Sequence, residues 1–346
     1  MSRATPTGGG GTVTAQVQPG RHLGWNHRSN MAKDLLRLTD LTSEDLWRLR
    51  RLTCEFGFDA EHHHGSLRDG AVLCWFKAST KWLAEIVSVA SERLGGRAVV
   101  VDPVELRPRR VGSVENAARV LSSLGRAIVV GGLEDGDLVR LAAAATVPVV
   151  NGFSDGHNPC EALAELATFE ARFGSLNGVR LAYLGQAGSV THELMAAAAL
   201  AGITLVVATP DGCQPSPIVT VQTRDVAQRN GGSIRLTREP THAVRHADGI
   251  VFGPVPSSWR RLRPDLLVDA SPDVVLLGCS PSAEVNGWPV GPRRLWRAQH
   301  RANRSCAYEA VLYALTNGLL EGAASAAPDI PASIPESALT PSTTSG

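Results

Sequence analysis

The sequence predicts an α/β protein with two domains, each built on a parallel β-sheet flanked by helices. Apolar runs of strand length alternate with segments of helical periodicity, and this alternation restarts after Gly174 and Gly178. Strands that alternate with helices form parallel sheets with crossover helices. The chain has 346 residues, of which 43% are hydrophobic, and single domains usually have about 100 to 200 residues. Its length therefore suffices for two cores.

A helix is expected first, because Thr42 and Asp45 form a capping-box pattern ahead of an amphipathic segment. Apolar runs then predict the strands of the first half, at 71–76, 98–101, 127–130 and 147–150. Segments of helical periodicity lie between or beside them, from residue 82 onward and around 113–124 and 134–145. The first half thus predicts one complete parallel sheet.

The second half repeats the alternation. Its expected strands are 180–184, 204–208, 249–252 and 273–277. A helix at 159–173 is expected to join the two domains, and a late helix is expected to return to the first. In such folds ligands bind at the carboxyl ends of the strands, in the crevice between the halves.

The two ends of the chain are expected to be disordered. Residues 1–32 are rich in Gly, Thr and Pro, and residues 323–346 are rich in Ala, Ser, Pro and Thr, so neither buries enough apolar surface to offset the entropy of ordering. Between them we expect a first domain at 33–165, completed by the C-terminal helix at 304–322, and a second domain at 166–303.

Composition excludes several classes of partner. The net charge of +1 gives no electrostatic basis for nucleic-acid binding. No apolar run approaches the roughly 18 residues that a membrane span requires. The six cysteines are scattered without a CxxC pair, which is typical of reduced thiols in a cytosolic protein. We therefore expect a cytoplasmic protein with neither a nucleic-acid nor a membrane partner.

Ser79 and Thr80 lie between a predicted buried strand and a predicted helix. At a helix start, free backbone N–H groups and the positive end of the helix dipole favour an anion, and two hydroxyls add donors. This placement predicts an oxyanion site. The alternative is that one hydroxyl only caps the helix, which is the usual role of Ser or Thr at such a junction.

Two other segments suggest cofactors but do not support them. Gly185–Val190 follows a strand and opens a helix, yet it lacks the GxGxxG spacing, and no acidic residue ends the next strand, so NAD binding is not expected. The run Glu61-His62-His63-His64 invites a metal, but three adjacent histidines cannot all face one ion, and a solvated loop is the better interpretation. We expect no cofactor and no metal.

Several blocks, taken in order and spacing, resemble the aspartate/ornithine transcarbamylase family, most closely its ornithine carbamoyltransferase branch. These blocks are Phe76–Leu83, Gly112–Leu121, Val147–Gly152 and Asn158–Leu166, within a resemblance from about Leu36 to about Leu320. The resemblance implies a transcarbamylase-like fold, a homotrimer with sites at subunit interfaces, and small-molecule substrates. The substrates would be an amine and carbamoyl phosphate, or another anion in place of carbamoyl phosphate. In the family reaction the amine attacks the carbonyl carbon of carbamoyl phosphate. Orientation and preorganised donors would supply the catalysis without a metal or cofactor.

The resemblance transfers only part of the anion site. The family loop reads Ser-Thr-Arg-Thr-Arg, whereas this chain has Ser79, Thr80, Lys81, Trp82 and Leu83. Lysine keeps a point charge but loses the bidentate fork of arginine.

The other anion-binding positions also differ. The next family arginine falls on Gly131, and His-Pro-Cys-Gln becomes Asn158-Pro159-Cys160-Glu161, in which Asn158 still offers an amide donor and Glu161 would repel phosphate. The arginine before the last helix is matched by Arg304. The catalytic residues that the resemblance implies are Thr80, Asn158 and Arg304, together with Cys279, which matches the cysteine of the family's His-Cys-Leu-Pro motif.

The acceptor site departs further from the family. The aspartate that would hold the side-chain amine of ornithine falls on Gly253, and an asparagine falls on Ser189. Ser-Met-Gly becomes Ser257-Ser258-Trp259, and His-Cys-Leu-Pro becomes Gly278-Cys279-Ser280-Pro281. Ordinary ornithine recognition is therefore not expected. The substrate-binding candidates are Ser79, Thr80, Lys81, Trp82, Arg107, Glu161, Ser189, Ser257 and Ser280.

The segment 106–110 contains more arginine than a connection requires. In the family, this loop reaches into the active site of the neighbouring subunit, and Arg107 falls where ornithine enzymes have glutamine. We hypothesise that Arg107 supplies the missing cation to that neighbour. The alternative is a solvated basic loop, because charge runs usually face solvent.

Three functions compete. The first is a diverged carbamoyltransferase that uses carbamoyl phosphate with an acceptor other than ornithine. The second is an enzyme of the same fold repurposed for amide or amidine chemistry in a specialised pathway. The third is a non-catalytic paralogue that assembles with an active relative. Fold alone does not choose among them.

Overall fold

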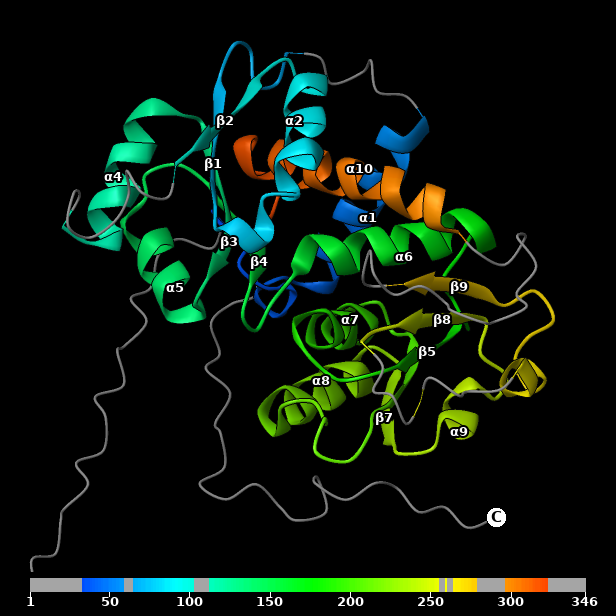
Figure 1. Ribbon diagram of the computed structural model, residues 1–346. Coiled ribbons are helices and arrows are strands. Elements are labelled where there is room, and N and C mark those ends of the chain that lie inside the picture. The colour runs from blue at the N-terminus through cyan, green and yellow to red at the C-terminus, as the bar shows by residue number, and fades with distance from the viewer. Residues whose placement is uncertain are drawn as a thin grey trace, which may run out of the picture.

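The computed structural model describes residues 33–58, 65–102, 112–254, 259, 264–278 and 296–322. Within them the chain forms two separate parallel sheets. Three long helices lie between the sheets (Figure 1): α1 (Ser43–Phe58), α6 (Pro159–Phe173) and α10 (Arg297–Thr316). The predicted α/β class with two parallel sheets is confirmed.

The first sheet has four strands in the order β2-β1-β3-β4. They are β1 (Ala71–Phe76), β2 (Arg97–Val101), β3 (Ala127–Leu133) and β4 (Val149–Ser154). The shorter elements around this sheet are η1 (Leu38–Asp40), η3 (Ala78–Thr80), α2 (Leu83–Arg93), α4 (Val114–Leu124) and α5 (Asp135–Ala144).

Strand β1 shows how the interior of this sheet is buried on both faces. All six of its residues are buried, as expected for an interior parallel strand covered by helices on each side. Val72, Cys74 and Phe76 pack into the core that also contains α1, α2 and α10. Leu73 and Trp75 face the opposite way, into a core with α4 and α5. The period of two residues thus separates the two cores.

The second sheet has five parallel strands in the order β7-β6-β5-β8-β9. They are β5 (Arg180–Leu184), β6 (Thr204–Ala208), β7 (Ser233–Thr237), β8 (Gly249–Phe252) and β9 (Val275–Gly278). The flanking helices are α7 (Ser189–Leu200), α8 (Pro217–Arg229), α9 (Pro240–Val244) and η4 (Pro264–Leu267).

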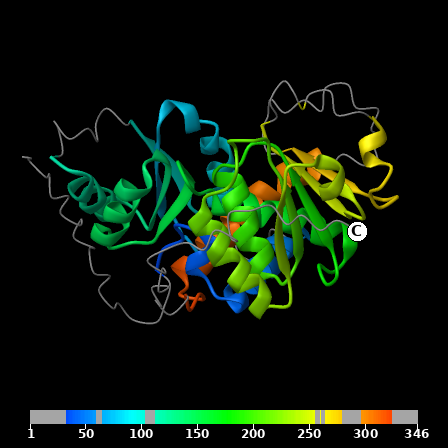
Figure 2. The ribbon, with the colours of Figure 1, turned by 90° about the horizontal axis from the view of Figure 1, so that it is seen from below.

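One core runs through both halves of the molecule. Helix α6 contributes Leu163 and Leu166, and the same cluster contains Leu312 of α10 and Leu181 of β5. Figure 2 shows the two sheets on either side of these central helices. Helix α10 packs against α1, α2 and α6, so the end of the chain returns to the first half, as expected.

Some boundaries differ from the expectation. Helix α10 begins at Arg297 and ends at Thr316, so it starts seven residues earlier than the predicted 304 and also ends earlier. The Thr42–Asp45 capping box is confirmed, since Asp45 N donates to Thr42 Oγ1 at 3.0 Å and Thr42 N donates to Asp45 Oδ2 at 3.1 Å. Among the described residues, no helix has both the length and the hydropathy to cross a membrane.

Candidate functional site

The loop after β1 carries the four residues expected to hold an anion. Ser79 and Lys81 are exposed, whereas Thr80 is buried and its Oγ1 donates to the carbonyl oxygen of Lys77 at 3.0 Å. The expected position of Ser79 and Thr80 at the start of the α-helix is wrong. They form the short helix η3, and α2 begins only at Leu83, without a side-chain cap. Neither hydroxyl therefore caps α2.

Gly131, the position at which the resemblance implies a family arginine, is packed against Thr80 and Leu83. Leu83 is 1% exposed. A Cβ atom built on Gly131 would lie 2.8 Å from Thr80 Oγ1 and 2.9 Å from Leu83 Cδ1, closer than real Cβ contacts. A side chain at position 131 would therefore displace Thr80 or Leu83 from this packing. The loop carries two exposed lysines, Lys77 and Lys81, on either side of the exposed Ser79 in sequence.

Arg304, which matches the family, is held by two groups of this chain. Its Nη2 lies 2.5 Å from Oε1 of Glu161, on the first turn of α6. Its guanidinium carbon also lies 5.7 Å from the ring centroid of Trp82, within cation–π range. The structure thus brings Trp82, Glu161 and Arg304 together. The charge of Arg304 is neutralised inside the protein by a carboxylate only 4% exposed.

Two residues outside the sequence-based candidates adjoin this ion pair. His300, one turn before Arg304 on α10, has its Nε2 3.4 Å from Oε1 of Glu161. Burial lowers the pKa of His300; Glu161 opposes this shift and Arg304 adds to it, so the imidazole is neutral near pH 7. Glu165 lies one turn after Glu161 on α6, and one ligand atom from each of Glu161, Glu165 and His300 lies within 4.8 Å of the others. The sequence signal was only the i, i+4 spacing of two acids.

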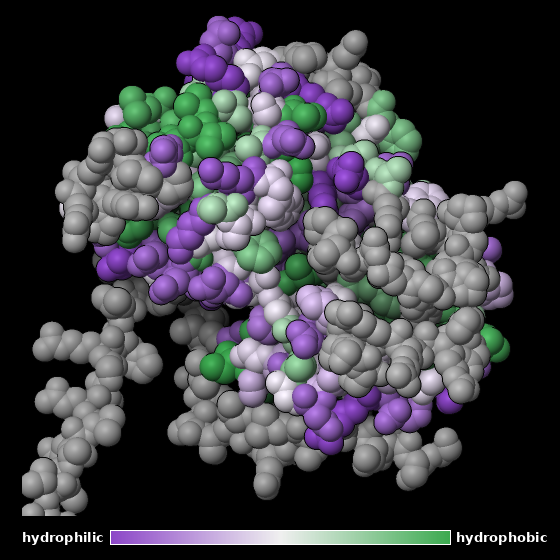
Figure 3. All heavy atoms as spheres, viewed as in Figure 1, coloured by the Kyte–Doolittle hydropathy of each residue, from purple (hydrophilic) through white to green (hydrophobic). Residues whose placement is uncertain are grey.

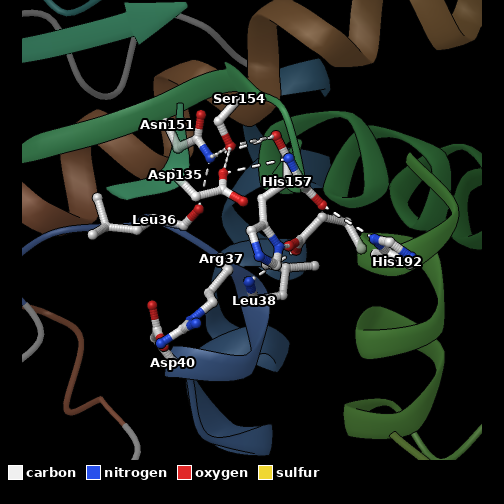
Figure 4. Close-up of polar contacts among 11 residues, drawn as sticks. Leu36, Arg37, Leu38, Asp40, Asp135, Asn151, Ser154, His157 and His192 are labelled. Carbon is white, nitrogen blue, oxygen red and sulfur yellow. Dashed lines mark hydrogen bonds and ion pairs between the residues drawn. The ribbon is translucent and has the colours of Figure 1, made fainter. Parts of the chain in front are cut away.

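Asn158 is buried at the N-cap of α6 and follows His157 directly in sequence. Figure 4 shows the polar network of the β4–α6 connection, which includes Asn151, Ser154 and His157. Asn151 Nδ2 donates to Ser154 Oγ at 3.0 Å and to the carbonyl oxygen of Leu36 at 2.8 Å. Ser154 Oγ in turn donates to Asp135 Oδ1 at 2.6 Å. The network ties the segment before η1 and the start of α5 to the connection that carries Asn158.

The same network extends into the second half through His157 and Glu193. His157 Nδ1 donates to Glu193 Oε1 at 2.5 Å, and Glu193 Oε2 accepts from the backbone N–H of Leu38 at 2.9 Å. His192 Nδ1 donates to the carbonyl oxygen of Gly156 at 3.4 Å. Burial lowers the pKa of His157, but the hydrogen bond and charge of Glu193 outweigh it, and the pKa lies above its ordinary value. No sequence pattern linked these residues, which lie 36 positions apart.

On the second sheet, the position expected to hold an acceptor amine is closed by Tyr183. A Cβ atom built on Gly253 would lie 1.8 Å from the phenol oxygen of Tyr183 and 2.6 Å from its Cζ. The phenol is fixed, since it donates to the carbonyl oxygen of Gln186 at 2.6 Å and the residue is 1% exposed. Ser189 is the first residue of α7 and is buried. An aspartate at position 253 therefore does not fit this packing.

Arg107, Ser257, Cys279 and Ser280 lie outside the described residues.

Comparison with protein families matches both halves of the chain. Residues 33–171 match the model described as "Aspartate/ornithine carbamoyltransferase, carbamoyl-P binding domain". Residues 177–257 match "Aspartate/ornithine carbamoyltransferase, Asp/Orn binding domain". The two matches meet within 171–177, close to the end of α6. The division into two sheets thus coincides with the division between the two family domains.

The similarity to several relatives extends over most of the length of each relative. An ornithine carbamoyltransferase of Pyrococcus abyssi is 32% identical over 314 residues, which cover 84% of this chain and 98% of that protein. The anabolic ornithine carbamoyltransferase of Pyrococcus furiosus is 33% identical over 267 residues, covering 72% of this chain and 84% of that protein.

Solved structures agree. The ornithine carbamoyltransferase structure from Pyrococcus furiosus superimposes with a TM-score of 0.76 at 31% identity, covering 84% of this chain and 98% of that one. The ornithine carbamoyltransferase structure from Gloeobacter violaceus superimposes with a TM-score of 0.73 at 28% identity, covering 83% of this chain and 99% of that one. On these sequence and structural similarities, the chain belongs to the aspartate/ornithine carbamoyltransferase family.

Proposed function

We propose that this protein is a carbamoyltransferase that transfers a carbamoyl group from carbamoyl phosphate to an amine other than ornithine. Membership of the family supports the donor and the reaction type. The observation that carries the altered acceptor is the contact between Tyr183 and Gly253, because the phenol occupies the space that an aspartate side chain would need. A site without that aspartate has no charge-assisted partner there for the ornithine ammonium.

The proposed donor site combines the loop after β1 with the start of α6. Lys81 and Ser79 are exposed and can reach a phosphate, and Arg304 can join them if an anion displaces Glu161. Asn158 would donate its amide to the developing oxyanion. Cys279, Ser257 and Ser280 keep the roles that the family resemblance implies, and Arg107 keeps its proposed role in a neighbouring subunit.

The reaction would need orientation more than proton chemistry. The amine nitrogen forms a bond to the carbonyl carbon, the C–O bond to phosphate breaks, and the nitrogen loses one proton as phosphate leaves. Holding the two substrates in line supplies most of the rate, and the cations stabilise charge on the carbonyl oxygen and the leaving phosphate. Lys81 is one such cation, whereas Arg304 contributes only after it separates from Glu161.

Consumption of carbamoyl phosphate tests this proposal directly. The purified chain would be incubated with carbamoyl phosphate and a panel of amines that includes ornithine, shorter and longer diamino acids, and monoamines. We expect phosphate release above background with at least one amine and not with ornithine. Turnover with ornithine would contradict the altered acceptor, and no turnover with any amine would contradict the enzyme assignment.

The ion pair between Glu161 and Arg304 favours a second candidate, a non-catalytic paralogue. A guanidinium already neutralised by a buried carboxylate binds an external anion poorly, because the anion must replace that partner. Co-expression with a catalytically intact carbamoyltransferase tests this candidate. A mixed oligomer with altered kinetics, together with no turnover by the chain alone, would support it.

We infer that the protein is a homotrimer, as its family resemblance implies. A group of hydrophobic side chains lies exposed on the first half: Val99 and Val100 on β2, and Val120 and Leu124 on α4. Figure 3 shows hydrophobic residues gathered over this face of the molecule. An edge strand with exposed valines is an aggregation hazard unless a partner covers it.

Light scattering on the purified chain tests the trimer. Val100→Lys on the edge strand should lower the measured mass towards that of a monomer, whereas Ile218→Lys, at a comparably exposed position on α8, should not. A wild-type monomer would contradict the proposal.

A cytoplasmic location is also inferred, since the five cysteines among the described residues are free thiols.

A further inference from the structure

Glu161, Glu165 and His300 form a buried cluster between α6 and α10. Their exposed fractions are 4%, 0% and 4%. The two glutamates come from successive turns of α6, and the histidine comes from the first turn of α10. Helices that face one another across a core commonly build metal sites from Glu and His side chains in this way. We refer to these three residues as the α6–α10 cluster.

The distances within the α6–α10 cluster suit a metal ion. One ligand atom of each residue lies within 4.8 Å of the others, and His300 Nε2 is 3.4 Å from Glu161 Oε1. Two ligands at about 2.0 to 2.1 Å from a tetrahedral ion are separated by about 3.4 Å. The distance between His300 Nε2 and Glu161 Oε1 therefore already equals the separation of two ligands around a tetrahedral ion. The ligand atom of Glu165 needs only a small movement towards the other two.

His300 supplies an observation independent of the two acids. Its Nε2 is buried, has no hydrogen-bond partner among the described residues, and lies 3.4 Å from Oε1 of Glu161. Buried ring nitrogens are normally hydrogen-bonded, so one left without a partner needs an explanation. A neutral imidazole nitrogen beside two carboxylates is a common ligand set for a divalent transition metal. A bound ion would satisfy this nitrogen.

The charges also favour a cation. Two buried carboxylates, Glu161 and Glu165, lie close together, and the guanidinium of Arg304 pairs with Glu161. Buried carboxylates are costly unless they are paired or bind a metal. With an ion bound, Arg304 would remain as a donor to the Glu161 carboxylate, the role that outer partners play around metal ligands. Arg304 is therefore compatible with the ion and does not compete for its position.

We propose that Glu161, Glu165 and His300 form a binding site for one divalent first-row transition metal ion. Zinc is the probe of choice, because it accepts mixed nitrogen and oxygen ligands without redox chemistry. The rival interpretation is a structural ion-pair cluster in which Glu161 only neutralises Arg304. The proposal does not depend on carbamoyl transfer.

The test needs a background in which other zinc ligands are removed. The histidines of the run His62-His63-His64 are additional zinc ligands in a titration, so the three are replaced by alanine in the full-length chain. After chelator treatment, calorimetry with zinc should give one equivalent per chain. Cobalt should give the visible bands of a low-symmetry four- or five-coordinate site, without the near-ultraviolet thiolate band that cysteine ligation would add.

Single variants then locate the ion. Glu165→Gln and His300→Gln should each weaken zinc binding by at least about 10- to 100-fold, since even outer-shell losses cost that much. Zinc should also raise the unfolding temperature of the background chain and not that of these variants. Glu193→Gln is the matched control, because Glu193 is equally buried and paired with a histidine elsewhere.

The result that overturns the proposal is equally specific. If chelator-treated background chain binds no zinc at millimolar concentration while folded by circular dichroism, the cluster is an ion-pair network only. If zinc binds but Glu165→Gln and His300→Gln bind it as tightly as Glu193→Gln does, the ion lies elsewhere and the assignment is wrong.

Discussion

The Glu161 carboxylate accepts a hydrogen bond of 2.5 Å from Nη2 of Arg304, across 143 positions of sequence. The family resemblance implies that Arg304 corresponds to a family arginine and that Glu161 replaces a glutamine. The side chains are 15% and 4% exposed, so the pair is formed largely out of water. Glu161 therefore supplies Arg304 with an internal partner that an external anion would have to displace.

We expect Glu161→Gln to increase the affinity for inorganic phosphate. The amide keeps a hydrogen-bond acceptor for Arg304 but removes the competing charge, and a charged hydrogen bond contributes about 1.5 to 3 kcal/mol, or roughly tenfold to a hundredfold in affinity. Calorimetry at low salt measures the change. Glu170→Gln is the control, because Glu170 also lies on α6 and pairs with a different arginine, Arg50 of α1. Equal phosphate affinity in wild type and Glu161→Gln would refute the idea.

The contact between Tyr183 and Gly253 makes a prediction about stability. Gly253→Ala places a methyl group against the fixed phenol and should lower the free energy of unfolding by about 1 to 3 kcal/mol, the usual cost of overpacking. In a Tyr183→Leu background, which removes the phenol oxygen and Cζ, the same substitution should cost clearly less. Urea unfolding of the four proteins measures the coupling. An equal cost in both backgrounds would show that the ring does not close this position.

Much of the fold could be predicted from the sequence because its strands are apolar and buried. Strands β1 and β5 were predicted with their observed bounds, since continuous apolar runs identify interior parallel strands. Strand β7 was not predicted. It is an edge strand, and its residues Ser233, Arg235 and Thr237 alternate with only two apolar ones. An edge strand keeps one side in solvent and needs no apolar run.

The candidate site could be predicted only in part. The resemblance identified Arg304 and Glu161, but nothing in the sequence indicated that the two side chains pair with each other. The approach of His300 to Glu161 depends on how α10 packs on α6, and the approach of Tyr183 to Gly253 depends on the register of β5 with β8. These contacts depend on the tertiary packing of elements that are far apart in sequence, and local sequence patterns do not predict that packing.

The pair of His157 and Glu193 should make stability depend on pH. The pKa of His157 is raised in the folded state, so its stabilising contribution is complete below its unfolded value of 6.5 and is lost as pH rises through the folded value. We expect Glu193→Gln to lower the free energy of unfolding by roughly 1 to 3 kcal/mol more at pH 6 than at pH 9. Urea unfolding at both pH values measures this difference.

Other charges face the same histidine, so the experiment needs a reference. Asp135 raises the pKa of His157 and Arg37 lowers it. In a His157→Phe background, the Glu193→Gln effect should lose the part of its pH dependence that the histidine supplies. If the pH dependence is the same in both backgrounds, another group is responsible and the assignment to His157 is wrong.

Glu309 should give a pH dependence confined to a different window. Its side chain is fully buried near Arg93, and burial raises the pKa from 4.5 to about 7 although Arg93 opposes the shift. The folded state therefore holds this proton more tightly than the unfolded state does. Stability from this group is present below pH 4.5 and is lost as pH rises through about 7.

Replacing Glu309 by glutamine removes the titration. We expect the stability of Glu309→Gln relative to wild type to increase by about 3 kcal/mol between pH 4 and pH 8, measured by urea unfolding at several pH values. Arg93→Gln should act in the opposite direction, since losing the cation raises the pKa of Glu309 further and steepens the decline of stability with pH. A constant difference between wild type and Glu309→Gln over this range would mean that the carboxyl group does not titrate there. The Arg93 ion pair, 3.5 Å long, would then outweigh the cost of burial.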